Sequence, residues 1–336
     1  MGYFQSLIQT RMFVLGMLFL LVLVAVSIGF GPLADADSSV RSLDVQQSDS
    51  MDKPPFPPSA AYPLGSNRFG QQMLWILIDG AKYTIGMAVA ISLAAMVLAV
   101  GCGFAMNALP KWISMPLAES FEAFHFVPLA LFVYWLVAPV LKLFNWSYGA
   151  EVEFFFPICV LIGLSVPILA VYVYRETREI ARREYIVNAK VLGPSRFHIY
   201  RKHVLPLFMP KLLVIFSQQV GRVLLVFAQL GLLNVFIGGG TEKVVGHELV
   251  KNEQGIMEEV EILSMFSNSH EWAGLIGKYW PQLEAAPWLI LGPVTAFALT
   301  LIAVNFVAEG MSTAAQWKPR KKRKGIAFSR KTDSVV

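Results

Sequence analysis

Residues 154–174 read FFFPICVLIGLSVPILAVYVY, and residues 175–203 continue RETREIARREYIVNAKVLGPSRFHIYRKH. The first stretch has no charged side chain, and its length matches the roughly 20 apolar residues that a helix needs to cross a bilayer. The second stretch holds eight Lys or Arg against three Glu, a net charge of +5. Because basic residues gather in the cytoplasmic loops of membrane proteins, this junction predicts a transmembrane helix that ends in the cytoplasm.

The composition of the whole chain agrees with a membrane location. Of its 336 residues, 55% are hydrophobic and 15% are charged, whereas soluble domains carry roughly 25% charged residues. The 24 Phe, 10 Tyr and 8 Trp residues exclude an intrinsically disordered chain. Cys102 and Cys159 lie in apolar runs, and two cysteines cannot supply a disulfide framework. The chain is therefore predicted to be an integral membrane protein.

Six apolar runs are long enough to span a membrane, at residues 12–30, 75–108, 124–143, 154–174, 207–237 and 287–308. Prolines inside these runs are tolerated in membranes because neighbouring groups satisfy the freed carbonyls. Ten-residue segments of alternating polarity are absent, which excludes a transmembrane β-barrel. The expected fold is an all-α polytopic bundle with about six transmembrane helices.

The first run has two interpretations. Ala34-Asp35-Ala36 resembles a cleavage site, as expected after a signal peptide. However, the apolar stretch at 12–30 is longer than the usual signal core. We therefore favour a retained membrane anchor.

Charge also predicts the orientation. The tail at 318–331 adds eight Lys or Arg without an acidic residue, whereas residues 236–286 carry eight Glu against three Lys. Residues 31–74 carry five Asp against three basic residues. By the positive-inside rule, both termini and the loop at 175–203 are expected in the cytoplasm.

The two acidic regions have different expected structures. Residues 31–63 are rich in Ser, Asp and Pro, which predicts an exposed, partly extended linker. Residues 241–271 are too acidic to span the membrane. The pattern from Glu258 to Leu263 predicts a short amphipathic helix on the outer surface.

The cytoplasmic loop carries the most informative pattern. Gly193 and Pro194 end a short helix. Tyr185, Ala189 and Leu192 recur at helical spacing, which gives a small face able to dock into a partner's groove. The alternative is an ordinary basic loop held on anionic lipid.

This loop resembles the "EAA" loop of the inner-membrane permease subunits of binding-protein-dependent ABC importers. The matching order is Glu184-Tyr185, Ala189, Gly193 and Leu205-Pro206. The flanking Arg-Glu-Tyr and Arg-Lys-His-Val-Leu-Pro are similar to the dipeptide/oligopeptide/nickel branch. Further similarity to that branch covers residues 63–70 with 79–85, and residues 286–288 with 305–310.

The resemblance implies the type I importer fold, with this loop forming a coupling helix in a groove of the ATP-hydrolysing subunit. The residues it assigns to ATPase coupling are Glu184, Tyr185, Ala189, Gly193, Leu205 and Pro206. It also implies two ATP-binding subunits, a second similar permease subunit and an extracytoplasmic substrate-binding protein as partners. The expected location is the plasma membrane of a bacterium or archaeon.

The resemblance and the charge pattern together predict the organisation of the chain. Residues 1–30 hold the N-terminal cytoplasmic end and first transmembrane helix, 31–74 an extracytoplasmic linker, 75–311 the permease transmembrane domain, and 312–336 a basic cytoplasmic tail. Within the permease domain, the coupling loop covers 175–206 and an outer loop covers 238–286.

Several positions depart from the pattern of the branch. Ser66-Asn67 stands where the branch usually has Thr-Asp, Gly70-Gln71-Gln72 stands where it has Gly-Arg-Asp, and Asn188 replaces the first Ala of the usual loop pair. Gln229 stands where an acidic residue is expected. These departures leave the cargo open among peptides, nickel chelates and other small solutes.

A polar stripe marks the run at 207–237. Gln218, Arg222 and Gln229 fall within roughly 40° of one another at about 100° per residue. Ionisable groups inside spans usually face protein or a water-filled cavity. The stripe is therefore a candidate translocation path in which Arg222 meets an anionic group of the substrate. The alternative is a structural ion pair of Arg222 with Glu122 or Glu309.

Motifs for catalysis are missing from the sequence. Residues 274–278 (GLIGK) lack the spacing and the following Ser or Thr of a phosphate-binding loop. The five histidines are scattered, and no Gly-x-Ser-x-Gly elbow is found. We predict no catalytic residue, no cofactor and no metal in this chain. The basic tail predicts an anchor on anionic lipid rather than a nucleic-acid site.

The sequence thus predicts the membrane-spanning permease subunit of an ATP-driven ABC importer, which translocates a peptide or related small solute delivered by an external binding protein. The alternative is a stand-alone channel or ion-coupled secondary transporter that uses the stripe around Arg222 and needs no ATPase.

Overall fold

The computed structural model describes residues 3–47, 54–60, 62–67, 70–143, 150–191, 195–236, 240–251, 257–267 and 270–316. Its elements in chain order are α1 (Tyr3–Gln9), α2 (Arg11–Gln47), α3 (Met73–Ala108), α4 (Lys111–Ala123), η1 (Phe124–Phe126), α5 (Leu129–Leu143), α6 (Ala150–Ile180), α7 (Glu184–Val191), α8 (Arg196–Ile199), the π-helical turn η3 (Tyr200–Val204), α9 (Leu205–Leu232), β1 (Gly240–Lys251), β2 (Met257–Ser267), α10 (Trp272–Tyr279), η4 (Trp280–Gln282) and α11 (Trp288–Gln316).

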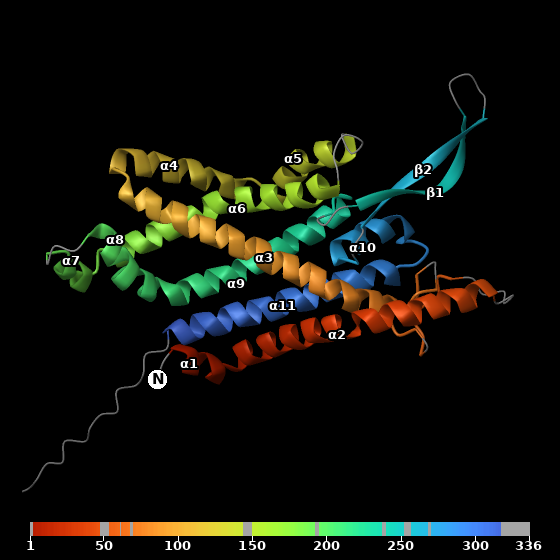
Figure 1. The fold of residues 1–336 in the computed structure, drawn as a ribbon, viewed down its shortest axis with the longest axis horizontal. Helices are drawn as coiled ribbons and strands as arrows, with labels where there is room; N and C mark the ends of the chain where they lie inside the picture. Colours follow the sequence, from red (N-terminus) through yellow and green to blue (C-terminus); the bar gives the residue numbers. More distant parts are fainter. Residues whose placement is uncertain are drawn as a thin grey trace, which may run out of the picture.

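The long helices form an elongated bundle with two distinct ends (Figure 1). One end holds α1, α7, α8 and the C-terminal end of α11, and the other holds α10 and the hairpin of β1 and β2. Helix α2 runs beside α11, and α3 packs against α6 along much of its length. Helix α7 and the hairpin of β1 and β2 therefore lie at opposite ends of the molecule.

Within the described residues, five helices are long and apolar enough to cross a membrane, and a sixth span is possible if α4 and α5 count as one. The prediction of one continuous span at 124–143 is wrong, because α4 and α5 meet at a break with a bend of 85°. Val127 is extended, with φ −90° and ψ 126°. The proline that follows disfavours helical geometry at this residue, so Pro128 separates the two helices.

The predicted extended linker also begins later than expected. Helix α2 continues from the first apolar run to Gln47, so residues 31–47 are helical. A helix that is already nucleated extends at little cost. Residues 31–47 also contain Leu, Ala and Gln, which favour helix.

The predicted outer amphipathic helix is a β-strand in the structure. β2 pairs antiparallel with β1, so that Gly240 lies opposite Ser267 and Lys251 opposite Met257. Val260, Glu261 and Ile262 alternate in polarity with a period of two, and β-branched residues favour strands. The short helix of this region is α10 instead, which follows the hairpin.

Helix α3 carries a face of small side chains at the centre of the bundle. Ala81, Ala88, Ala95 and Ala99 are fully buried. A Cβ built at Gly103 would lie 2.7 Å from a methyl group of Val173 on α6. Because apolar lipid gives helices no hydrophobic reason to associate, such small residues stabilise the bundle by allowing close approach.

Helix α10 is seated inside the bundle rather than on its surface. Its residues from Trp272 to Gly277 are all buried. The backbone of His270 lies so close to α3 that a Cβ on Gly80 would be 1.9 Å from the His270 carbonyl oxygen. A Cβ on Gly231 of α9 would likewise be 2.4 Å from the Ala273 carbonyl oxygen. A side chain at residue 80 or 231 would clash with the backbone of residues 270–273, so α10 can take this position only when both residues are glycine.

This packing predicts that Gly80→Ala destabilises the protein by about 1–3 kcal/mol, because overpacking forces backbone shifts. The measurement is the apparent Tm of the purified full-length chain, and we expect a fall of several degrees. Gly86→Ala is the matched control on the same helix, since a Cβ at Gly86 meets nothing within 4 Å. Equal Tm values for the two variants would contradict the seating of α10 on Gly80.

Candidate functional site

The predicted coupling helix is present as α7, at the end of the bundle farthest from the hairpin. The carbonyl oxygen of Arg183 accepts hydrogen bonds from the N–H groups of Ile186 (2.9 Å) and Val187 (3.0 Å), which starts the helix. Ile186 is fully buried in a core cluster, whereas Tyr185 and Val187 are 48% and 44% exposed. One side of α7 is thus anchored, and Tyr185 lies on the exposed side.

The other predicted coupling residues flank this helix. Glu184 is exposed at the start of α7, and Ala189 is half-buried. Gly193 lies outside the described residues. Leu205 is half-buried and Pro206 exposed in the first turn of α9, where the missing N–H of proline costs nothing.

The candidate path residues Gln218 and Arg222 lie together in a cavity of about 370 Å³. Both side chains are exposed on α9. Gln229 is exposed on the same helix but does not line the cavity. The remaining lining comes from the α4–η1 junction, α6 and α9, and comprises Glu122, His125, Ile168, Leu169, Val171, Tyr172, Arg175, Glu176, Glu179, Ile215 and Gln219.

Ion pairs in this cavity leave Arg222 available. Arg175 binds both carboxylate oxygens of Glu122, at 2.9 and 2.5 Å. Lys211 pairs with Glu176 between α9 and α6. Within the described part of the chain, Arg222 makes no ion pair with Glu122 or Glu309. The cavity therefore offers a guanidinium to an incoming anionic group.

Sequence reasoning missed the acidic and basic residues on α6 that face Arg222 across the cavity. Arg175, Glu176 and Glu179 belong to the predicted cytoplasmic loop, but α6 extends to Ile180 and carries them at the end of the span. The break between α4 and α5 brings Glu122 and His125 to the same cavity. No local sequence signal marks these contacts, because they depend on how three helices pack.

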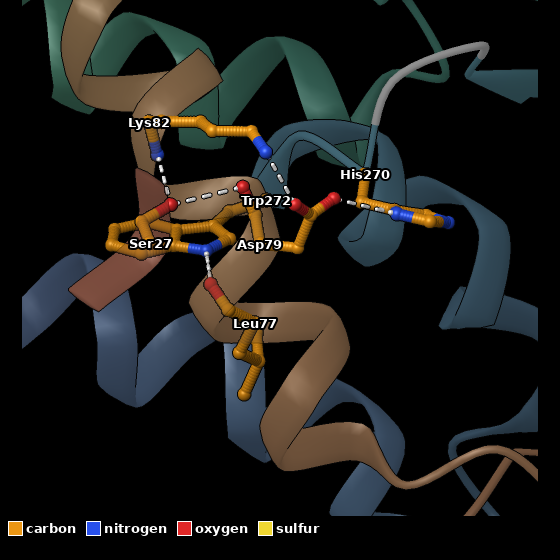
Figure 2. A network of polar contacts seen from close by, with 6 residues as sticks. All are labelled: Ser27, Leu77, Asp79, Lys82, His270 and Trp272. Atoms are coloured by element: carbon orange, nitrogen blue, oxygen red, sulfur yellow. Dashed lines mark hydrogen bonds and ion pairs between the residues drawn. The ribbon is translucent and has the colours of Figure 1, made fainter. Parts of the chain in front are cut away.

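A second polar group lies at the end of the bundle that holds α10 (Figure 2). The Asp79 carboxylate contacts Lys82 Nζ at 2.6 Å and His270 Nδ1 at 3.1 Å. The Trp272 indole N–H donates to the Leu77 carbonyl at 2.8 Å. Ser27 of α2 donates to the Asp79 carbonyl (3.2 Å) and accepts from the Lys82 N–H (3.0 Å). These bonds connect α2, α3 and the start of α10.

The positions where the chain departs from the dipeptide/oligopeptide/nickel branch contribute to the same end. Ser66 and Asn67 are buried, at 0% and 1% exposure. The Ser66 hydroxyl accepts from the Phe56 N–H at 2.9 Å, and its carbonyl accepts from the Trp288 indole at 3.4 Å. Asn67 donates to Gln71 at 2.8 Å. In this chain, these residues hold the segment before α3 against the start of α11.

The described residues form no candidate metal-binding site. Among the residues that the structure describes, no three His, Cys, Asp or Glu side chains group to hold a metal ion. Asp79 and His270 are engaged with each other and with Lys82. The chemistry available in the cavity and the network is ion pairing and hydrogen bonding.

Comparison with known proteins identifies the class. The chain belongs to the family described as binding-protein-dependent transport system inner membrane component, whose model matches residues 4–318. It is a multi-pass membrane permease component of an ABC importer, a transport subunit and not an enzyme. Such a component works with an ATP-hydrolysing subunit and a substrate-binding protein.

Individual relatives are distant. The chain is 20% identical to the dipeptide transport system permease protein DppC of Alkalihalophilus pseudofirmus, over 93% of this chain and 87% of the relative. It is 21% identical to the glutathione transport system permease protein GsiD of Pectobacterium atrosepticum, over 76% and 73%. It is 26% identical to the oligopeptide transport system permease protein OppC of Haemophilus influenzae, over 45% and 40%.

The network around Asp79 predicts a graded response to mutation. Asp79→Ala leaves the Lys82 ammonium without its carboxylate, which we expect to cost about 1–3 kcal/mol, less than for a fully buried pair. His270→Ala is the comparison variant, because the His270 side chain is 48% exposed. The apparent Tm of the purified chain should fall by several degrees for the first variant and clearly less for the second. A larger fall for His270→Ala would show that Asp79 is not the centre of the network.

Proposed function

We propose that this chain imports peptides or a related small zwitterionic solute through a path lined by α9, α6 and the α4–η1 junction. The observation that carries the proposal is the cavity in which Arg222 and Gln218 face a set of acidic and basic side chains. Ionisable groups at membrane depth are costly and mark substrate pathways. The DppC, OppC and GsiD relatives are named for dipeptide, oligopeptide and glutathione transport, which supports this class of cargo.

The charges in the cavity suit a cargo that carries both signs. Arg222 makes no ion pair within the described part of the chain and can meet a carboxylate. Glu179 lines the same cavity from α6 and can meet an ammonium group. The bidentate pair of Glu122 with Arg175 lies between the helices that form the walls, so a passing charged group can exchange partners with it.

ATP hydrolysis is coupled to this path through α7 in our proposal. The exposed Glu184 and Tyr185 would contact the ATPase subunit, while the buried Ile186 transmits movement of α7 to the bundle. Two ATPase subunits and a second homologous permease subunit complete the proposed assembly. The opposite end of the bundle, with the hairpin and α10, would face the substrate-binding protein.

The proposed orientation follows from the two ends of the bundle. The N-terminal helix α1, the end of α11 and α7 share one end, and the neighbouring sequence there is strongly basic. We propose that this end is cytoplasmic. The contacts of α2 with α3 and α11, including Ser27 with Asp79, support a first helix that is retained in the folded protein.

The path predicts that Arg222→Leu lowers uptake by about tenfold to a hundredfold, the range expected for losing a hydrogen bond to a charged group. Uptake of labelled dipeptides and tripeptides by vesicles that contain the assembled importer provides the measurement. Arg222→Lys keeps the charge and should retain most of the uptake. Normal assembly with unchanged uptake of a transported peptide in Arg222→Leu would show that Arg222 does not line the path.

The coupling proposal predicts different defects for two neighbours on α7. Tyr185→Ala removes an exposed aromatic side chain, and we expect at least about tenfold weaker association with the ATPase subunit at unchanged Tm. Ile186→Ala creates a core cavity and should lower the Tm, at a cost of about 2–5 kcal/mol. Pull-down of the ATPase subunit and thermal unfolding separate the two effects. If Tyr185→Ala leaves both association and stimulated ATP hydrolysis intact, Tyr185 does not contact the ATPase.

A further inference from the structure

A basic cavity lies away from the proposed path, at the end of the bundle that holds α7. Its volume is about 580 Å³. Three cationic side chains line it, Lys111 at the start of α4, Arg178 in the last turn of α6 and Arg182 in the turn that follows α6, and no Asp or Glu does. The remaining lining is formed by Met106, Asn107, Ala108, Leu109, Pro110, Ser114, Tyr174, Ala181 and Tyr200.

Hydrogen bonds between helices hold the walls of this cavity in place. The Asn107 side-chain amide donates to Thr177 Oγ1 at 2.9 Å, which joins the end of α3 to α6. Ser114 and Tyr174 share a hydrogen bond of 3.1 Å, which joins α4 to α6. Arg178 donates to the Tyr174 hydroxyl and lies over its ring, 5.5 Å from the centroid. The cavity is therefore a preorganised feature of three packed helices.

No acidic side chain lines this cavity, although the same three cations also line a neighbouring cavity together with Glu119 and Glu179. Lys111, Arg178 and Arg182 line one cavity, and like charges at close range repel one another. Lys111 and Arg182 are exposed and make no ion pair with a described residue. An anion with several acceptor oxygens would relieve the repulsion and would suit the donor fork of arginine.

The surroundings indicate where such an anion comes from. Apolar side chains beside the cavity are exposed: Trp112 at 77%, Met115 at 52% and Leu109 at 39%. Tryptophan next to lysine is typical of the membrane–water interface. In the proposed orientation this is the cytoplasmic leaflet, which is rich in anionic lipid.

We propose that this cavity binds the phosphate group of an anionic phospholipid, with the acyl chains lying along Trp112 and Met115 on α4. The bound lipid connects α4 to α6 at the cytoplasmic end of the helices that line the path. The proposal rests on the proposed orientation of the chain. It does not depend on which solute is imported.

The test is native mass spectrometry of the full-length chain, purified with its partner subunits and supplied with phosphatidylglycerol or phosphatidylcholine. We expect preferential retention of phosphatidylglycerol. The Lys111→Gln/Arg182→Gln variant should retain it about 30-fold less, which corresponds to about 1 kcal/mol for each removed cation. Arg201→Gln/Lys202→Gln is the matched control, because these exposed cytoplasmic cations do not line the cavity.

Three results would overturn the proposal. The first is that the wild type and Lys111→Gln/Arg182→Gln retain the same amount of phosphatidylglycerol. The second is that the control variant Arg201→Gln/Lys202→Gln loses as much phosphatidylglycerol as Lys111→Gln/Arg182→Gln does. The third is that inorganic phosphate, added without lipid, binds in the Lys111-dependent way while phosphatidylglycerol does not, which would identify a soluble anion as the ligand. Lipid retention is measured without transport. A failure of the lipid proposal is therefore distinguishable from a failure of the proposed path at Arg222.

Discussion

The structure depends on the close seating of α10 between α3 and α9. Helices in a bilayer gain nothing from hiding apolar surface from lipid, so close packing and hydrogen bonds must hold them together. Gly80 and Gly231 let the backbone around His270 and Ala273 approach two helices at once. The Trp272 indole then donates to the Leu77 carbonyl at 2.8 Å. This hydrogen bond joins the start of α10 to α3 at the end of the bundle that holds the hairpin.

The two ends of the molecule use polar residues in different ways. At the end that holds α10, Asp79 binds both Lys82 and His270 and so connects separate elements. In the middle and at the opposite end, Arg222 and Lys111 lie in cavities without an ion pair to a described residue. The first arrangement stabilises the bundle, whereas the exposed cations of the second can bind an anionic ligand.

Most of the sequence-based spans are confirmed, because about 20 consecutive apolar residues leave few alternatives to a membrane helix. The errors are local and have physical reasons. Pro128 breaks a run that hydropathy alone treats as continuous. Residues 257–267 form a strand rather than a helix because they pair with β1, a partner that lies outside the local pattern. The placement of Gln218 and Arg222 on one face followed from helical geometry. Arg175 and Glu179 were not expected beside them, since they come from another helix, and Glu122 was expected only as an alternative ion-pair partner of Arg222.

The sequence by itself determined the membrane class, the positions of most helices, the family loop at α7 and the polar face of α9. The membrane class, the helices and the polar face are properties of single segments, decided by local apolar length, helical period and charge, whereas the loop at α7 was identified by its resemblance to a family motif. Only the tertiary structure decided which charges meet. Arg175 pairs with Glu122 although 53 positions separate them, and Asp79 meets His270 across 191 positions. Such pairings depend on the crossing and register of helices, which small residues such as Gly80 and Gly103 set through close backbone approach.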